Sequence, residues 1–177
     1  VILDNNDLVG FNTDIAGFTN AIKDLQFNIK GKKVFILGAG GVVPSIIFAL
    51  NKMEVSKIII TNRTREKAES LKKQFPNISI IDWGEMTDFD LVINATSLGL
   101  NNEMINLDFS RSEKNKLFYD VIYNPNETNF LKEGKRLGNQ IENGKLMFIY
   151  QAQEAFKIWH GIMPEISHKT LKLFEND

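Results

Sequence analysis

The sequence predicts an α/β protein built as a doubly wound parallel sheet with helices on both faces. Two observations predict this fold. Short apolar runs alternate with amphipathic helical patterns along most of the chain, and a glycine-rich stretch directly follows one of those runs. Strands that are separated by helices pair in parallel, because the helices serve as crossovers and cover the sheet. The 177 residues are enough for one large domain.

The first residues predict a hairpin followed by a helix. Residues 1–11 have the pattern of two short strands joined by a polar turn. Apolar side chains recur at helical spacing from Ile15 to Leu25 and predict a helix over 14–25. Because the chain begins with Val1 inside a strand pair, we expect further residues of the same protein upstream.

The rest of the chain alternates between strands and helices. Strands are predicted over 32–37, 57–62, 78–82, 90–97, 116–123 and 139–142. Helices are predicted over 43–53, 65–75, 127–137, 144–161 and 164–175. The last of these is expected to begin at Pro164, because proline is favoured in a first helical turn.

The composition excludes several classes of function. The net charge of −1 argues against nucleic acid or a membrane surface as a partner, since both require a clustered basic excess. The absence of Cys and the presence of two His argue against a metal site. No apolar run has the length of a membrane span, and no signal peptide is visible, so we expect a cytoplasmic protein.

The glycine-rich stretch predicts a dinucleotide site of the Rossmann type. Three glycines, with Ala39 and Val42 between and after them, separate a strand from a helix: Gly38, Gly40 and Gly41. Such a loop makes a tight turn, lets a pyrophosphate approach the backbone and aims helix N–H groups at its charge. The alternative is a tight turn without a ligand. A Walker-type phosphate loop is excluded, because no Gly-Lys-Ser/Thr follows.

The end of the second strand of the sheet predicts which dinucleotide binds. An NAD site usually has an acidic residue here, which accepts a hydrogen bond from the ribose 2′-hydroxyl. This chain instead has Asn62, Arg63 and Thr64, followed by Arg65. These side chains can donate hydrogen bonds to a 2′-phosphate, which favours NADP. The alternative is that Thr64 caps the next helix and the arginines are solvated.

The stretch "GFNTD" near the start of the chain allows two interpretations. Asn12, Thr13 and Asp14 precede the first predicted helix, and all three side chains can accept hydrogen bonds from its free N–H groups. Helix capping therefore explains the stretch without any function. The other interpretation, a catalytic role for Asp14, depends on the rest of the sequence.

Six motifs occur in the order and spacing of shikimate dehydrogenases, and the chain resembles that family over nearly its whole length. They are "GFNTD", "GAGG", "TNRT", "INATSLG", "YDVIYNPNETNFL" and "NGKLMFIYQAQEAFKIWHG". The resemblance implies NADPH-dependent reduction of 3-dehydroshikimate to shikimate, in the pathway to aromatic amino acids. It also implies that Asp14 assists proton transfer by a lysine of an N-terminal substrate domain. The expected partner is this small-molecule substrate, and the expected assembly is a monomer or homodimer.

The resemblance also assigns further site residues. Tyr123 and Gln151 match substrate-binding positions, although an amide on a mostly buried helix needs a hydrogen-bond partner in any case. The remaining matches are to positions that line the cofactor: Thr96, Ser97, Gly144 and Met147. A helical Met is also a common core residue, so Met147 has a purely structural alternative.

The chain departs from the family pattern in three ways. Val43 stands where a small residue is usual, which is expected to loosen the packing of the helix on the strand. Leu146 stands where Gly is frequent, which is expected to alter the shape of the nicotinamide pocket. The N-terminal substrate domain is absent, so residues 1–13 are expected to be its hinge-side end and 14–177 the NADP-binding domain.

Two other functions remain open at this point. The first is a quinate/shikimate dehydrogenase that uses NAD, which an acidic residue near Asn62 would have favoured. The second is an NADP-binding module without catalysis, which has no need for Asp14, Tyr123 and Gln151.

Overall fold

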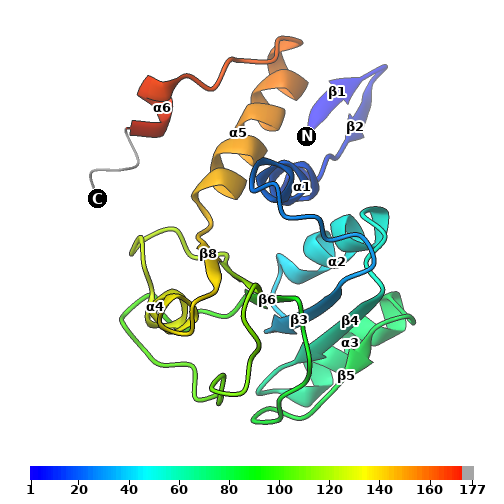
Figure 1. Ribbon diagram of the computed structural model, residues 1–177. Coiled ribbons are helices and arrows are strands. Elements are labelled where there is room, and N and C mark those ends of the chain that lie inside the picture. The colour runs from blue at the N-terminus through cyan, green and yellow to red at the C-terminus, as the bar shows by residue number, and fades with distance from the viewer. Residues whose placement is uncertain (173–177) are drawn as a thin grey trace.

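The structure is a computed structural model that describes residues 1–172 (Figure 1). A six-stranded sheet, parallel throughout, has the strand order β5-β4-β3-β6-β7-β8. A separate antiparallel hairpin precedes it. Counted from β3, the order of the large sheet is that of the doubly wound dinucleotide-binding fold. The predicted fold class is therefore confirmed.

The elements follow the predicted alternation. The strands are β1 (Ile2–Asp4), β2 (Asp7–Val9), β3 (Lys33–Leu37), β4 (Lys57–Thr61), β5 (Ser79–Ile80), β6 (Leu91–Asn94), β7 (Leu117–Asp120) and β8 (Gln140–Glu142). The helices are α1 (Asp14–Asp24), α2 (Val43–Lys52), α3 (Arg65–Gln74), α4 (Asn129–Arg136), α5 (Lys145–His160) and α6 (His168–Lys172). The strands predicted over 90–97 and 116–123 both end earlier, and the residues freed at their carboxyl ends form turns.

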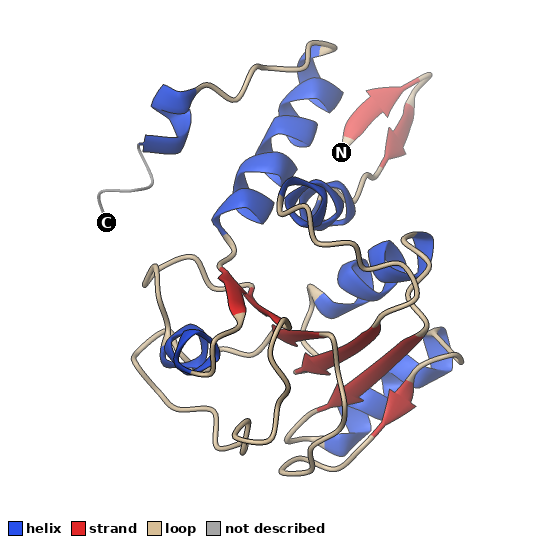
Figure 2. Cartoon of the chain, viewed as in Figure 1, coloured by secondary structure: helices blue, strands red, loops and turns tan. Residues whose placement is uncertain are grey.

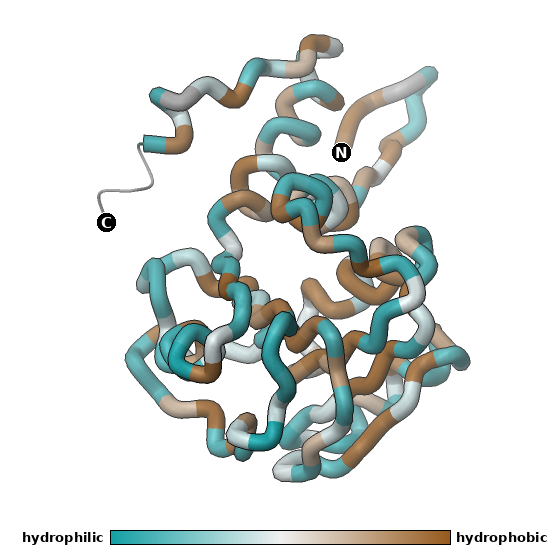
Figure 3. The backbone as a smooth tube through the Cα atoms, viewed as in Figure 1, coloured by the Kyte–Doolittle hydropathy of each residue, from teal (hydrophilic) through white to brown (hydrophobic). Residues whose placement is uncertain are grey.

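The two faces of the sheet have separate cores. Alternate residues of β3 show the division, since Val34 and Ile36 belong to one core and Phe35 and Leu37 to the other. Helices α1, α2 and α3 contribute side chains to the first core, and α4 packs on the opposite face (Figure 2). The strands between these layers consist largely of hydrophobic residues, which are drawn in brown in Figure 3. The prediction of helices on both faces is confirmed.

The core opposite α1 and α2 is built largely from phenylalanine. Phe118 of β7 lies beside Phe109 and Phe130 with ring centroids 5.3 Å away in each case. Phe89 and Phe109 of this core come from the segment between β5 and β7. Among the described residues, this segment contains β6 but no helix. Burial of these rings is what fixes the long loops against the sheet.

Helices α1 and α5 cross in close contact above the first core. Gly17 permits this crossing, because a Cβ atom there would lie 2.7 Å from the Met147 carbonyl oxygen and 2.9 Å from the Gln151 Cβ. The crossing brings the start of α1, which follows the "GFNTD" stretch, next to the middle of α5.

The helix predicted over 164–175 begins four residues later than expected. The observed α6 starts at His168, and the Ser167 Oγ accepts a hydrogen bond from the Thr170 N–H at 3.2 Å, as a capping residue does. Pro164 instead uses its carbonyl oxygen to accept a bond from the Gln153 side chain at 2.7 Å, which ties the segment to α5. The last part of the prediction, 173–175, lies outside the described residues.

The looser packing expected from Val43 beneath the glycine-rich loop stays a prediction. Its side chain is fully buried within the first core, among residues of the strands and α2. Leu146 also packs against that core. Within residues 1–172, no helix combines the length and the apolar character needed to cross a membrane.

Candidate functional site

A cavity of about 260 Å³ lies at the carboxyl ends of β3, β4 and β6. It brings together most of the residues that the sequence assigns to cofactor binding: Gly38, Ala39, Gly40, Asn62, Arg63, Thr64, Thr96 and Ser97. Four further residues line it that sequence reasoning missed: Lys67, Trp83, Ala95 and Leu98. In a doubly wound sheet, ligands bind at this edge, where the strand order reverses between neighbouring strands.

The glycine-rich loop has the geometry that a pyrophosphate site requires. Gly38 adopts φ +112°, and a Cβ there would lie 2.7 Å from the Ala95 carbonyl oxygen, so only glycine fits. Gly40 and Gly41 are exposed, and the nearest atom to a Cβ at Gly40 would be 3.9 Å away. The fold itself therefore does not demand these two glycines, and the space in front of them is open to a ligand.

Helix α2 adds a positive electrostatic end to this loop. It begins directly after Val42 and has no acidic residue in its first turn. The partial positive charge of the helix N-terminus is therefore not neutralised by a side chain. Together with the open glycines, this arrangement fits the pyrophosphate of a dinucleotide.

The turn after β4 places one arginine at the cavity, whereas the next arginine along the chain lies outside it. Arg63 lines the cavity and makes no hydrogen bond or ion pair among the described residues. Arg65 forms ion pairs with Asp82 and, at 3.3 Å, with Glu69. Arg65 does not line the cavity, and its charge is already paired with residues of α3 and of the loop after β5.

Thr64 stands at the start of α3 but does not cap it. It occupies the N-cap position, yet its hydroxyl makes no capping hydrogen bond, so the capping alternative is wrong. The turn is held instead by Asn62, whose Nδ2 donates to the Thr64 carbonyl oxygen at 2.7 Å. Lys67 follows one helical turn after Thr64 and adds a second cation to the cavity. None of the described residues that line the cavity is acidic.

A second group of predicted residues lies together at the crossing of α1 and α5. The Thr13 Oγ1 donates to the Gln151 Oε1 at 3.2 Å, which joins the "GFNTD" stretch to α5. One turn earlier on α5, Phe148 stacks on Tyr123 with ring centroids 4.9 Å apart. Thr13, the neighbour of Asp14, therefore contacts α5 at Gln151, and Tyr123 contacts the same helix three residues earlier. Phe148 was missed, although its spacing of three from Gln151 places it on the same side of the helix.

The hydrogen bonds at the start of α1 show which of Asn12, Thr13 and Asp14 accepts a bond from a backbone N–H group there. The Asn12 Oδ1 accepts a hydrogen bond from the Asp14 N–H at 3.1 Å, and the Asn12 Nδ2 donates to the Ser45 Oγ at 2.9 Å. Thr13 occupies the N-cap position without a side-chain capping bond. The half-buried Asp14 carboxylate makes no hydrogen bond or ion pair among the described residues, so it is not needed to build the turn.

Four predicted cofactor residues do not line the cavity of about 260 Å³: Gly41, Val42, Gly144 and Met147. Gly41 and Val42 continue the loop into α2. Gly144 precedes α5, and a Cβ there would lie 2.1 Å from the Val121 carbonyl oxygen, so this glycine lets α5 approach the end of β7. Met147 is 7% exposed and belongs to the first core, as its structural alternative states.

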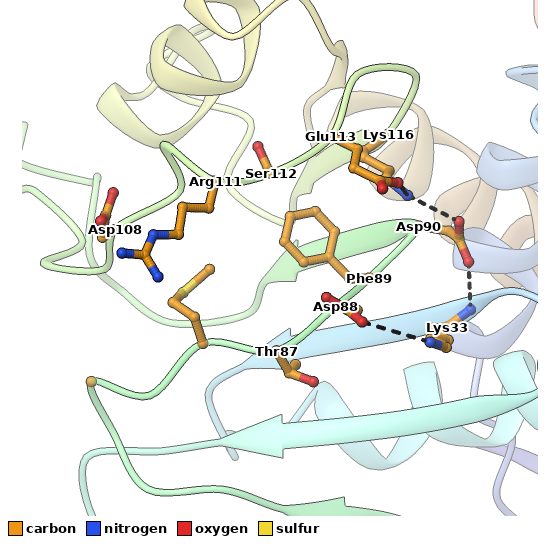
Figure 4. A pocket seen from close by; sticks show the side chains of 12 residues that line it. Lys33, Thr87, Asp88, Phe89, Asp90, Asp108, Arg111, Ser112, Glu113 and Lys116 are labelled. Carbon is orange, nitrogen blue, oxygen red and sulfur yellow. Dashed lines mark hydrogen bonds and ion pairs between the residues drawn. The ribbon is translucent and has the colours of Figure 1, made fainter.

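A larger cavity, of about 770 Å³, lies at the opposite edge of the sheet (Figure 4). Lys33, the first residue of β3, lines it, whereas the glycine-rich loop follows the last residue of that strand. Its central charges are paired with one another. Asp90 accepts hydrogen bonds from the Lys33 N–H at 2.9 Å and from the Lys116 Nζ at 3.4 Å. These contacts tie together the amino ends of β3, β6 and β7 and give Asp90 and Lys116 a structural role.

Comparison with known proteins gives a consistent picture. Residues 20–129 match the family model described as shikimate / quinate 5-dehydrogenase. The chain is 55% identical over 172 residues to a Pelagibacter ubique protein named shikimate dehydrogenase (NADP(+)), covering 97% of this chain and 65% of the relative. This chain thus spans less than two thirds of that relative's length.

Solved structures share the fold. A shikimate 5-dehydrogenase from Thermus thermophilus, in complex with NADP(H) and shikimate, aligns with a TM-score of 0.80 and 30% identity, covering 88% of this chain and 59% of that one. A quinate dehydrogenase from Corynebacterium glutamicum, in complex with NAD, aligns with a TM-score of 0.81 and 28% identity over 94% of this chain and 61% of that one. With the family model matched over most of the chain, this protein belongs to the shikimate / quinate 5-dehydrogenase family.

Proposed function

We propose that this chain is the NADP-binding part of a shikimate dehydrogenase, which interconverts 3-dehydroshikimate and shikimate. The observation that carries the proposal is the cavity at the carboxyl edge of the sheet. It combines open glycines with Arg63 and Lys67, and none of the described residues that line it is acidic. The name of the Pelagibacter relative, shikimate dehydrogenase (NADP(+)), supports it.

The residues of the cavity divide the work of holding NADP. The backbone N–H groups of 40–42 and the start of α2 bind the pyrophosphate, since they carry uncompensated positive charge. Arg63 and Lys67 pair with the 2′-phosphate, and Asn62 and Thr64 add neutral donors. When bound, the nicotinamide supplies the hydride acceptor or donor. We assign its surroundings to the 96–97 turn and to the start of α5 at Gly144 and Met147.

The second group of residues forms the substrate side of the site. Asp14 has a carboxylate without a partner among the described residues, so it is available to accept or share the proton of the reacting hydroxyl. Gln151 and Tyr123 offer an amide and a phenol that hydrogen-bond the hydroxyls of the ring. The Thr13 contact at 3.2 Å orients the Gln151 amide and leaves its NH₂ group for this purpose.

The rest of the active site is supplied by a further domain. We propose that residues 1–13 are the hinge-side end of that substrate domain and that 14–177 form the NADP-binding domain. Large apolar side chains are exposed on the hairpin and at the end of α5, including Leu3, Leu8 and Trp159 at 68%, 79% and 62%. This pattern supports a covering partner at that end of the molecule. The lysine that pairs with Asp14 belongs to the same further domain. We place the protein in the cytoplasm, as a monomer or homodimer.

Two alternatives remain distinguishable. A quinate dehydrogenase that uses NAD is supported by the likeness to the Corynebacterium structure, but the cavity offers no acidic acceptor for a ribose 2′-hydroxyl among its described lining residues. An NADP-binding module without catalysis does not account for Asp14, Gln151 and Tyr123, which dinucleotide binding alone does not need.

The proposal is tested by an activity assay on this chain extended with the substrate domain of a full-length relative. We expect NADP-dependent oxidation of shikimate, followed by the absorbance of NADPH, and no turnover from the 177-residue chain alone. Holding substrate and nicotinamide at reacting distance contributes about 7–11 kcal/mol, and the chain alone holds only one of the two. Oxidation of quinate with NAD in place of shikimate with NADP would favour the first alternative.

A further inference from the structure

A buried polar network joins the carboxyl ends of β6 and β7, between the cofactor side and the substrate side of the site. Asn94 ends β6 and Asp120 ends β7, and the two residues are paired across the strands. Both are fully buried. The Asn94 Nδ2 donates to the Asp120 Oδ1 at 3.0 Å. We refer to Asn94, Thr96, Asp120 and Thr128 as the Asp120 network.

One branch of the network fixes the turn that lines the NADP cavity. The Asn94 Oδ1 accepts hydrogen bonds from the Thr96 N–H at 3.1 Å and from the Thr96 Oγ1 at 2.7 Å. The Thr96 Oγ1 in turn accepts from the Leu98 N–H at 3.1 Å. Asn94 also donates to the Leu98 carbonyl oxygen at 3.0 Å. Every one of these bonds acts on the 96–98 turn, and each leads back to the side chain that Asp120 holds.

The other branch fixes the loop that carries Tyr123. The Asp120 Oδ1 accepts a hydrogen bond from the Ile122 N–H at 3.0 Å, directly before Tyr123. The Asp120 Oδ2 accepts from the Thr128 Oγ1 at 2.6 Å, and Thr128 is the N-cap of α4. One carboxylate therefore holds both ends of the 121–128 segment.

We propose that Asp120 is a positioning residue that couples the 96–98 turn of the cofactor site to the Tyr123 loop of the substrate site. The inference rests on the proposed function. Asp120 is fully buried and is absent from the cavity lining, so it acts through Asn94 and Thr128 and not by contact with a ligand. Hydrogen bonds in such a buried network depend on one another, because a group that loses its partner there has no water to replace it.

The substitution Asp120→Ala tests the coupling, because it removes both carboxylate oxygens. The Asn94 Nδ2, the Ile122 N–H and the Thr128 Oγ1 then all lose their acceptor. The 96–98 turn offers neutral groups to the cavity and no cation, so its displacement weakens NADP and NAD alike. We expect both dissociation constants of the full chain, measured by titration calorimetry, to rise about 5- to 20-fold.

Matched variants separate positioning from loss of stability. Thr128→Val removes the hydroxyl at nearly constant volume and is expected to weaken both dinucleotides, although Thr128 does not line the cavity; Thr128→Ser is expected to restore binding. Leu50→Ala, a fully buried residue on α2 outside the network, should lower the melting temperature but leave both dissociation constants within about 2-fold. Binding is measured well below each variant's melting temperature.

Amide hydrogen exchange gives a readout that does not depend on a ligand. In Asp120→Ala, exchange of the Leu98 and Ile122 amides should accelerate together, by about 10-fold, since both branches lose the same anchor. Unchanged dinucleotide affinities, or acceleration at Ile122 without Leu98, would overturn the proposal. A wild-type chain that binds neither dinucleotide would contradict the proposed cofactor, and the exchange measurement would still decide the coupling.

Discussion

At the scale of single residues, the assignment of NADP depends on which cation of the β4–α3 turn is free. The sequence places Arg63 and Arg65 two positions apart and does not distinguish them. The structure does, because Arg65 is paired with Asp82 and Glu69 while Arg63 lines the cavity. The acidic partners of Arg65 lie 17 and four positions away in sequence, and the more distant one is brought near only by the fold.

Substitution of Arg63 by alanine should therefore weaken NADP binding and leave NAD binding nearly unchanged. A charge-assisted hydrogen bond contributes about 1.5–3 kcal/mol, which corresponds to a loss of about 10- to 150-fold in NADP affinity. Arg65→Ala is the matched control and should change NADP affinity by less than about 3-fold, because surface ion pairs contribute little. Titration calorimetry with both dinucleotides measures this. Equal losses of NADP and NAD in Arg63→Ala would refute the 2′-phosphate assignment.

Substitution of Asp14 distinguishes a catalytic role from helix capping. Its carboxylate has no partner among the described residues, so Asp14→Asn should lower the free energy of unfolding by no more than about 1 kcal/mol, the usual effect of one charge at a helix N-terminus. In the chain extended with a substrate domain, turnover should fall by about 10²- to 10⁴-fold. Steady-state rates and melting curves of the same preparations provide the comparison. A variant that melts early but keeps its turnover would leave Asp14 with a structural role alone.

At the scale of elements, the crossing of α1 and α5 sets the geometry of the proposed substrate side of the site. Gly17 lets the two helices approach until Thr13 reaches Gln151. The sequence marks both helices through their apolar spacing, but periodicity cannot show that they cross at this glycine. The same limit applies to the start of α6, where a capping serine at 167 determined the boundary and not the proline at 164.

Gly17→Ala should destabilise the protein through this crossing. The new Cβ would meet a backbone oxygen at 2.7 Å, and neither helix can yield without moving the other. Such overpacking typically lowers the free energy of unfolding by about 1–3 kcal/mol. Gly10→Ala is the control, since nothing lies within 4 Å of a Cβ there, and its effect should stay within about 0.5 kcal/mol. Urea unfolding measures both, and a Gly17→Ala variant as stable as the control would mean that the crossing is loose.

Asp120, at the end of β7, should make the free energy of unfolding depend on pH. Burial raises the pKa of Asp120 to about 6, despite hydrogen bonds that favour its ionised form. In the unfolded chain the pKa is about 4, so the native state binds the extra proton between about pH 4 and 6. Asp120 therefore contributes stability at low pH that is lost as the pH rises through about 6, by up to about 3 kcal/mol.

The difference in unfolding free energy between the wild type and Asp120→Asn isolates this group from other carboxyls, such as Asp90 and Glu103, whose pKa values are lowered. Urea unfolding at a series of pH values should show the wild type losing its relative stability between about pH 4 and 6 and a constant difference above about pH 7. If the stability of the wild type relative to Asp120→Asn instead rises with pH over this interval, the three hydrogen bonds that Asp120 accepts lower its pKa by more than burial raises it.

At the scale of the whole molecule, the parallel sheet and most of its elements follow from the sequence alone. Apolar strands alternating with helices determine the fold class, and the glycine-rich loop locates the edge of the sheet where the cavity of about 260 Å³ lies. The site residues that could not be predicted from the sequence lie on elements that only the fold brings together. Trp83 reaches the cavity from the loop after β5, and Phe148 reaches Tyr123 from α5. The Asp120 network depends on the pairing of β6 with β7, which no local pattern encodes.

At the same scale, we expect this chain to bind NADP selectively and to lack most of the groups that hold the substrate. A melting titration of the 177-residue chain with NADP, NAD and shikimate tests this most directly. At a concentration 100 times the dissociation constant, a ligand stabilises the native state by about 2.7 kcal/mol, which corresponds to about 5–10 °C for a chain of this size. We expect a shift of that order with NADP, and little or none with NAD or shikimate at the same concentration. A shift with NAD as large as that with NADP would contradict the assignment of NADP as the cofactor.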